Sequence, residues 1–291
     1  MGVSVVIPAK NESGSIPALI KGLQALDALD EIIIVDDGST DGTGDIASEL
    51  GAKVVRHPYS KGNGAAIKSG ARSAAGDTIV FMDADGQHSP EDVARLLERL
   101  GQGYDMVVGA RQAGSQASVG RGLANSLYNR LASYMTGQKV EDLTSGFRVV
   151  KREMFLQFLS LLPNGFSYPT TSTMAFFRAG YSVAYEPIHT AQREGKSHIK
   201  PIRDGVRFLL IIFKIGTLYS PLKLFVPLAF AFFFLGAGYY GYTFITENRF
   251  TNMSALLLTT SLMIFLVGLV SEQITSLLYI SSDKDSDKGE K

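Results

Sequence analysis

Residues 80–88 place two carboxylates one residue apart at the end of an apolar run. Because successive strand side chains point to opposite faces, Asp83 and Asp85 can aim the same way from the strand's end. Mg²⁺ and Mn²⁺ prefer carboxylate oxygens and commonly bind through one or two carboxylates plus the phosphates of a substrate. The pair predicts a divalent metal site that works with a nucleotide. The alternative is an acidic loop before a helix, since Ser89 and Pro90 are typical of a helix start.

The elements that must position this pair alternate along the first two thirds of the chain. Short apolar runs, rich in β-forming residues, predict strands at residues 3–7, 32–35, 52–55, 78–82 and 106–108. Helical stretches between them are predicted at residues 16–29, 45–50, 65–75 and 90–100. This order predicts an α/β fold with a mostly parallel, Rossmann-like sheet covered on both faces. In such sheets, ligands bind beyond the carboxyl ends of the strands.

Two further polar motifs fall at predicted strand ends. Residues 8–12 follow the first strand, and residues 36–43 follow the second. A carboxylate at such an end can accept a hydrogen bond from a base N–H or a ribose hydroxyl, while Gly38 and Gly42 allow tight turns. The Gly-rich turn at residues 61–64 fits neither the dinucleotide fingerprint nor the phosphate loop, which disfavours both of those nucleotide folds.

Composition excludes several classes of function. The 291 residues carry no net charge, which disfavours nucleic acid as a partner bound through bulk electrostatics. The chain has no cysteine, which excludes disulfides and thiolate metal sites. His57 and His189 follow predicted strands and are interpreted as structural residues.

Apolar residues dominate the last third of the chain. Two runs, at about residues 222–245 and 253–274, approach or exceed the roughly 20 residues needed to cross a bilayer, so residues 221–280 are predicted to form two transmembrane helices. A buried helical hairpin in a soluble protein is the alternative. Several basic residues precede the first run and follow the second, whereas Arg249 is the only basic residue in the connection between the runs. The positive-inside rule then predicts a multi-pass membrane protein with both termini and the N-terminal domain in the cytoplasm.

The segments that flank this hairpin have a different character. Residues 200–220 mix basic and apolar side chains, which predicts an amphipathic helix at the membrane interface; a linker helix packed on the soluble domain is the alternative. Residues 281–291 are polar and are predicted to be disordered. The first eight residues lack a basic leader, so no cleavable signal peptide is expected.

The motifs at residues 6–12, 35–43 and 83–88 together resemble glycosyltransferase family 2, which has the GT-A fold. Residues 109–111, 121–130, 142–148 and 193–197 resemble its dolichol-phosphate mannose synthase and polyprenyl-phosphate glycosyltransferase branch. The likeness covers about residues 1–220, and it implies a GT-A catalytic domain over residues 1–199. It also implies a nucleotide-sugar donor, a polyprenyl phosphate acceptor, and Mg²⁺ or Mn²⁺ as cofactor.

The resemblance also implies roles for individual residues. Those implied to hold the nucleoside are Pro8, Glu12, Val35 and Asp37. Those implied to hold the diphosphate and the metal are Asp83, Ala84, Asp85 and Gln87, of which Asp83, Asp85 and Gln87 would be the metal ligands. Those implied to bind the phosphates of donor and acceptor are Arg111, Arg121, Arg193 and Lys196. Arginine forks together with a cation can bring two like-charged phosphates into contact.

The expected reaction follows from the acceptor. A phosphate monoester is already anionic, so it can attack the anomeric carbon without a base, and catalysis would consist of positioning and leaving-group stabilisation. A single displacement inverts the anomeric centre. Asp142 is therefore expected to orient Arg121 or Arg148 rather than to act as a base.

Several alternatives stay open from the sequence. Processive polysaccharide synthases share the GT-A motifs, but their pattern includes a Gln-x-x-Arg-Trp motif and this chain has no Trp. A lipid acceptor without phosphate, or a non-catalytic membrane-anchored protein that binds nucleotide sugars, is a further alternative. The donor stays open between GDP-mannose and a UDP-hexose, and the acceptor stays open between undecaprenyl and dolichyl phosphate. Two-helix anchors often associate, so a homo-oligomer is compatible with the sequence.

Overall fold

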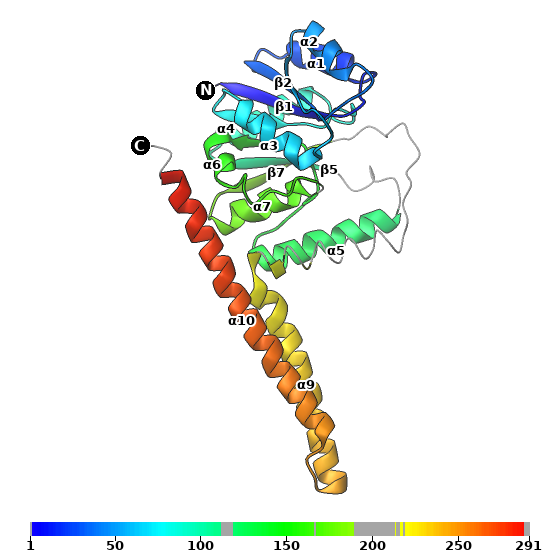
Figure 1. The fold of residues 1–291 in the computed structure, drawn as a ribbon, viewed down its shortest axis with the longest axis vertical. Helices are drawn as coiled ribbons and strands as arrows, with labels where there is room; N and C mark the ends of the chain where they lie inside the picture. Colours follow the sequence, from blue (N-terminus) through cyan, green and yellow to red (C-terminus); the bar gives the residue numbers. More distant parts are fainter. Residues whose placement is uncertain are drawn as a thin grey trace. The chain divides into compact units, whose positions relative to one another are not determined.

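The computed structural model describes residues 2–111, 119–165, 167–188, 213, 216, 217 and 219–287, without the side chains of 119–125 and 278–287. Contacts divide the chain into two units, Met1–Ser197 and His198–Lys291, and each is described by itself. The first unit contains a sheet with helices around it, and the second contains two long helices (Figure 1).

Seven strands of the described residues form one sheet with the order β3-β2-β1-β4-β6-β5-β7. Neighbouring strands are parallel except at β6, which runs antiparallel to both β4 and β5. The predicted mostly parallel α/β sheet is therefore confirmed. The strands are β1 (Val3–Ala9), β2 (Glu31–Asp36), β3 (Lys53–Arg56), β4 (Thr78–Phe81), β5 (Met106–Arg111), β6 (Arg148–Lys151) and β7 (Val183–Ile188).

Helices cover both faces of the sheet, as predicted. On one face, Ile20 and Leu96 belong to the same buried apolar cluster as Val5 of β1. On the other face, the ring of Phe81 lies 4.6 Å from that of Phe155 and 6.2 Å from that of Tyr168. The helices are α1 (Ile16–Gln24), α2 (Thr43–Glu49), α3 (Asn63–Ser73), α4 (Glu91–Gly101), α5 (Val119–Thr136), α6 (Arg152–Gln157) and α7 (Tyr168–Arg178).

Helix α3 packs closely on the sheet because a glycine faces the strands. A Cβ atom at Gly70 would collide with the side chain of Val6 and would lie 3.1 Å from Cγ2 of Val35. Both valines are fully buried. The missing side chain therefore lets α3 pack directly on β1 and β2.

Apart from a strand before His189, the sequence analysis assigned no element between residues 112 and 188, where the structure has β6, β7 and α5–α7. Strand β6 is only four residues long, Arg-Val-Val-Lys, so it shows neither a clear alternation nor a long apolar run. Its place between β4 and β5 depends on pairing with strands that are distant in the sequence, and local patterning carries no information about that pairing.

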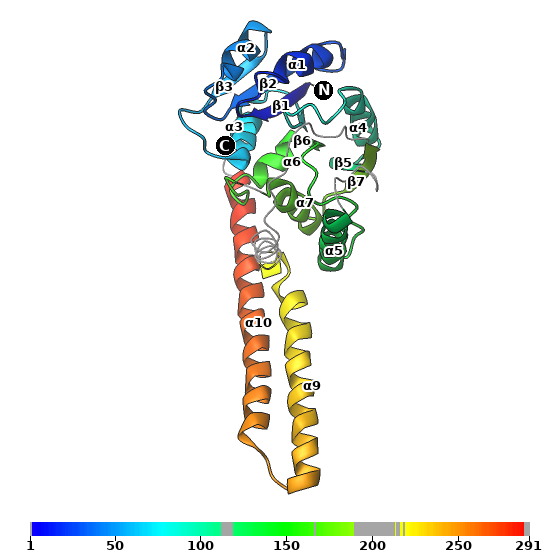
Figure 2. The same ribbon diagram turned by 90° about the vertical axis from the view of Figure 1, so that its right-hand side faces the viewer.

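The second unit contains two antiparallel helices that lie side by side in both views, α9 (Pro221–Glu247) and α10 (Asn252–Asp287) (Figures 1 and 2). Pro221–Glu247 and Asn252–Leu277 are each long and apolar enough to cross a bilayer. Small residues allow close contact, since a Cβ atom at Gly268 would lie 2.6 Å from that of Phe225. Most large apolar side chains of both helices are exposed, which suits contact with lipid.

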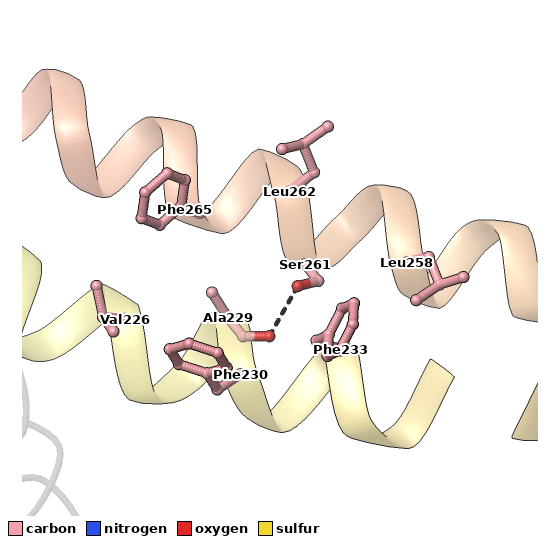
Figure 3. A pocket seen from close by; sticks show the side chains of 8 residues that line it. All are labelled: Val226, Ala229, Phe230, Phe233, Leu258, Ser261, Leu262 and Phe265. Atoms are coloured by element: carbon pink, nitrogen blue, oxygen red, sulfur yellow. Dashed lines mark hydrogen bonds between the residues drawn. The ribbon is translucent and has the colours of Figure 1, made fainter. Parts of the chain in front are cut away.

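An apolar groove of about 470 Å³ lies between α9 and α10 (Figure 3). Phe230, Phe233 and Phe265 contribute aromatic rings to its lining. At this groove the hydroxyl of Ser261 donates a 2.8 Å hydrogen bond to the carbonyl oxygen of Ala229, so the polar group is satisfied between the two helices. Such bonds suit a helix pair in lipid, because no water is present to take them.

Helix α10 continues to Asp287, so the predicted disordered tail is wrong for residues 281–287. Once a helix has formed, each further residue adds a hydrogen bond at little cost, and a polar segment can prolong it without packing. The predicted interfacial helix at residues 200–220 falls mostly outside the described residues.

Candidate functional site

A cavity of about 300 Å³ lies where β1, β2 and β4 end. Most of the residues predicted for the donor site line it, namely Pro8, Glu12, Asp37, Asp83, Ala84 and Asp85. Residues that the prediction did not include also contribute, namely Ala9, Lys10, Ser60, Gly62, Asn63 and Ala66. The last four come from the turn before α3 and from α3 itself. A cavity thus lies beyond the carboxyl ends of the strands, where a ligand site was predicted.

Val35 does not line this cavity. Its side chain is fully buried in β2 and packs under α3 beside Gly70. It therefore packs behind the cavity, and the nucleoside contact predicted for Val35 stays a prediction. Gln87 is also absent from the lining, and its backbone N–H donates a 3.2 Å hydrogen bond to Oδ1 of Asp85.

Asp83 and Asp85 both face the cavity from the turn after β4. Gly86 has a φ of +70°, which gives the turn the left-handed residue it needs to reverse after the pair. The side chain of Asp83 is 39% exposed, and so it is open to a ligand. A Cβ atom at Gly146 would lie 2.9 Å from Oδ2 of Asp83, so the glycine lets the loop before β6 approach this carboxylate.

The donor set at this turn fits a hard divalent cation. Carboxylate oxygens suit Mg²⁺ or Mn²⁺, which usually complete their coordination with water and substrate phosphates. Within the described residues no group of three or more His, Asp or Glu side chains could close around an ion. An ion at Asp83 and Asp85 would therefore depend on oxygens from a ligand.

His88 lies under the acidic turn. Its ring stacks on that of Phe147 with centroids 4.9 Å apart, and its Nε2 lies 3.9 Å from Oδ2 of Asp83. Burial lowers the pKa of His88 to about 4, and the nearby charge of Asp85 opposes that shift. The imidazole is consequently neutral at pH 7 and adds no positive charge beside the two carboxylates.

Asp37 is almost fully enclosed by hydrogen bonds from its own domain. Its Oδ1 meets Nδ1 of His57 at 2.7 Å and accepts from the backbone N–H of Lys61 at 2.8 Å. Its Oδ2 accepts from the hydroxyl of Ser60 at 2.8 Å and from the backbone N–H of Gly62 at 2.9 Å. All four acceptor positions are used, so Asp37 fixes the loop 60–62 that walls the cavity. His57 is structural, as predicted.

We expect Asp37→Asn to destabilise the first unit in a pH-dependent way. Burial alone would raise the pKa of Asp37, but the hydrogen bonds from His57 and the loop lower it to about 2 from the usual 3.8. A lowered pKa contributes stability that is present above pH 4 and is lost as the pH falls towards 2. Asp37→Asn should therefore lower the free energy of unfolding in urea by about 2 kcal/mol at pH 7. The exposed Asp27→Asn is the control; a pH-independent difference would contradict this account.

Arg111, at the end of β5, forms a two-pronged ion pair with Asp142. Its Nε lies 2.8 Å from Oδ2 and one terminal nitrogen lies 2.9 Å from Oδ1. The same nitrogen donates to the hydroxyl of Thr144 at 2.6 Å. Burial alone would raise the pKa of Asp142, but the hydrogen bonds from Arg111 lower it, so the carboxylate stays charged. Among the described residues Asp142 pairs with Arg111, a partner that the sequence analysis did not name.

Arg148 has a role that the sequence analysis did not assign. It is fully buried in β6 and donates to the carbonyl oxygen of Ser145, to that of Pro169 at 2.9 Å and to the hydroxyl of Ser172 at 2.8 Å. Its guanidinium lies 5.7 Å from the ring centre of Tyr168. Arg148 thus ties the loop before β6 to α7, and in this way it fixes the loop that carries Asp142.

Three predicted phosphate-binding residues cannot be placed at the cavity. Arg121 belongs to α5, but its side chain lies outside the described residues. Arg193 and Lys196 lie outside the described residues altogether, and so does His189. Their predicted roles stay predictions.

A mixed, mostly parallel α/β sheet with an acidic pair at the end of β4 defines the GT-A class of glycosyltransferase fold. Residues 4–159 match the model of glycosyl transferase family 2, and residues 220–277 match that of the GtrB C-terminal hairpin. The chain belongs to glycosyl transferase family 2.

Similar proteins cover different parts of the chain. Glycosyltransferase AglJ of Haloferax volcanii is 28% identical over 291 residues, which span 94% of each chain. Undecaprenyl-phosphate 4-deoxy-4-formamido-L-arabinose transferase of Pectobacterium carotovorum is 37% identical over 52% of this chain, and the match spans about half (49%) of that protein. Polyprenol monophosphomannose synthase of Mycolicibacterium smegmatis is 30% identical over 65% of this chain and 77% of its own.

Solved structures give the same fold. Glucosyl-3-phosphoglycerate synthase from Mycobacterium tuberculosis, in complex with Mn²⁺ and UDP-glucose, has a TM-score of 0.57 and 27% sequence identity. The similarity covers 74% of this chain and 78% of that one. The predicted GT-A fold and the predicted family are therefore confirmed.

Proposed function

We propose that the protein transfers a sugar from a nucleotide sugar to a polyprenyl phosphate and releases a nucleoside diphosphate. One observation carries the proposal: Asp83 and Asp85 face a cavity at the strand ends, and Arg111 lies close enough for its charge to interact with Asp83. Acidic and basic groups within electrostatic reach of one another suit two phosphates and a cation. The similarity to polyprenyl-phosphate sugar transferases supports the same reaction.

The acidic pair is proposed to hold Mg²⁺ or Mn²⁺ together with the donor diphosphate. A bound cation would neutralise the charge that develops on the leaving diphosphate. Asp83 and Asp85 supply oxygen ligands, and Gln87 is the third ligand proposed. Pro8 and Glu12, which also line the cavity, are proposed to contact the nucleoside.

The state of Asp142 favours a phosphate acceptor. A hydroxyl acceptor would need a base, and a free carboxylate near the acidic pair is the usual choice. Both oxygens of Asp142 are bound by Arg111, and backbone N–H groups of Thr144 and Ser145 each lie 3.1 Å from Oδ1. A lipid phosphate is already ionised and needs no base. Arg111 can help to bind this phosphate, while an oxygen of the phosphate attacks the sugar and displaces the nucleoside diphosphate in one inverting step.

Helices α9 and α10 are proposed to anchor the enzyme as two membrane spans, with both termini and the catalytic unit in the cytoplasm. The basic residues that flank the two runs support this orientation. A polyprenyl phosphate is held in the bilayer, so an anchored enzyme meets its acceptor at the surface of the membrane.

A transfer assay tests the proposal. The full chain in detergent is given undecaprenyl or dolichyl phosphate and a panel of labelled GDP- and UDP-sugars, with Mn²⁺, with Mg²⁺ or with EDTA. We expect metal-dependent movement of label into the organic phase from one donor. That result would identify the sugar, the nucleotide and the acceptor together.

Two other results would redirect the proposal. Transfer to a lipid without phosphate would identify a different acceptor class within the same family. Nucleotide binding without transfer from any donor would instead favour a membrane-anchored binding protein.

A further inference from the structure

A second cavity, of about 490 Å³, lies beside α3 in the first unit. Its volume is in the range of small-molecule sites. It is lined by Tyr59, Ser60, Lys61, Ala65, Lys68, Ser69, Arg72 and Asn164, and of these only Ser60 also lines the donor cavity. Lys68 and Arg72 are four residues apart in α3, so they lie on one face of the helix. The feature is therefore a separate concavity, which we call the basic cavity.

The basic cavity concentrates positive charge. Three cations, Lys61, Lys68 and Arg72, line it, and no carboxylate does. Within the part of the chain that the structure describes, none of the three forms an ion pair. Burial lowers the pKa of Lys68, and the charge of Arg72 lowers it further. The like charges in this concavity repel one another and attract an anion.

Other groups around the cavity are already engaged. Nζ of Lys68 donates to the carbonyl oxygen of Leu162 at 2.9 Å, which holds the ammonium at the wall. Two N–H groups in the first turn of α3, those of Gly64 and Ala65, donate to the carbonyl oxygens of Gly165 and Asn164 at 3.1 and 2.9 Å. These two groups are thus not free for an anion. Any anion held here must be bound mainly by the side-chain cations.

Two ammonium groups and one guanidinium suit an anion with three or more oxygens better than they suit a carboxylate. A phosphate presents three strong acceptor oxygens and up to two charges, whereas a carboxylate presents two oxygens and one charge. A guanidinium can donate hydrogen bonds to two of the phosphate oxygens, while the ammonium groups donate to the third oxygen. The exposed ring of Tyr59, with Nζ of Lys61 5.9 Å from its centre, adds an apolar surface that a larger molecule can contact.

We propose that the basic cavity binds a phosphate group, either that of an anionic lipid headgroup or free phosphate. This inference does not depend on the transfer reaction, because the acidic pair and Arg111 do not line the basic cavity.

The test compares the full chain with two double variants in neutral detergent. Lys68→Gln/Arg72→Gln removes two cations of the cavity, and Lys21→Gln/Lys139→Gln removes the same charge at exposed positions elsewhere. Binding of radiolabelled inorganic phosphate is measured by equilibrium dialysis, and binding of dioctanoyl phosphatidic acid by calorimetry. Nucleotide binding and thermal unfolding establish that both variants fold.

We expect Lys68→Gln/Arg72→Gln to weaken phosphate binding at least tenfold and the control pair to change it less than twofold. Phosphatidic acid that binds more tightly than inorganic phosphate, and is affected in the same way, would identify a lipid headgroup as the ligand. Equal affinities would identify free phosphate. If neither probe distinguishes Lys68→Gln/Arg72→Gln from the control pair, the proposal is wrong.

Discussion

Replacing Asp85 with asparagine should reduce sugar transfer about a thousandfold, because it removes a charged metal ligand at the proposed leaving diphosphate. Addition of EDTA to the unchanged protein should have a similar effect. Asparagine has nearly the same shape, so the turn after β4 should keep its fold. Transfer of labelled sugar into the organic phase measures the loss, and Mn²⁺ titrations should give a weaker apparent metal affinity for the variant.

Glu91→Gln is the matched control, since Glu91 is an exposed carboxylate in the first turn of α4. It removes the same charge a few residues away and should leave transfer within a factor of about two. Activity of Asp85→Asn within tenfold of the original, with no effect of EDTA, would exclude a catalytic metal at this turn.

Arg111→Lys and Asp142→Asn should each lower the rate of sugar transfer about a hundredfold. The rate of the double variant should be no lower than that of the less active single variant. Lysine keeps the charge but loses the two-pronged contact, and asparagine loses the charge that orients the guanidinium. If Asp142 acts only through Arg111, the two losses are not additive. The rate of sugar transfer, measured at saturating donor and varied acceptor concentration, gives the loss for each variant.

Arg95→Lys provides the control, because Arg95 also forms an ion pair, with Asp92 at 2.8 Å, and does not line the donor cavity. That change should leave transfer almost unaltered. Arg111→Ala is less informative, since it would leave the buried carboxylate of Asp142 unpaired at a cost of about 3–5 kcal/mol in stability. Fully additive losses would show that Asp142 has a separate role, such as that of a base.

The acidic pair could be placed from the sequence because its position depends on local features. An apolar strand that ends in Asp83 and Asp85, followed by a glycine and a helix start, fixes both the element and its end. The order of strands and helices then places that end beside those of β1 and β2.

The partner of Asp142 could not be predicted in this way. Arg111 and Asp142 meet because β6 inserts between β4 and β5, with Val108 opposite Arg148, and this pairing joins distant segments. Arg148 was overlooked as a structural residue because its main partners are carbonyl and hydroxyl oxygens, which no sequence pattern marks. For Val35, the family motif suggested contact with the nucleoside, but α3 covers this side chain.

The loop that Asp37 holds has a further consequence. Ser60 lines both the donor cavity and the basic cavity, and Ser69 of the basic cavity is joined to Asp37 through His57, with 2.9 Å between Oγ of Ser69 and Nε2 of His57. If a ligand on one side moved this loop, it would change the affinity on the other side. Thermodynamic linkage requires the reverse effect to be of equal size. Binding of the donor in one cavity would then change the affinity of the basic cavity for phosphate, and phosphate would change the affinity for the donor by the same factor.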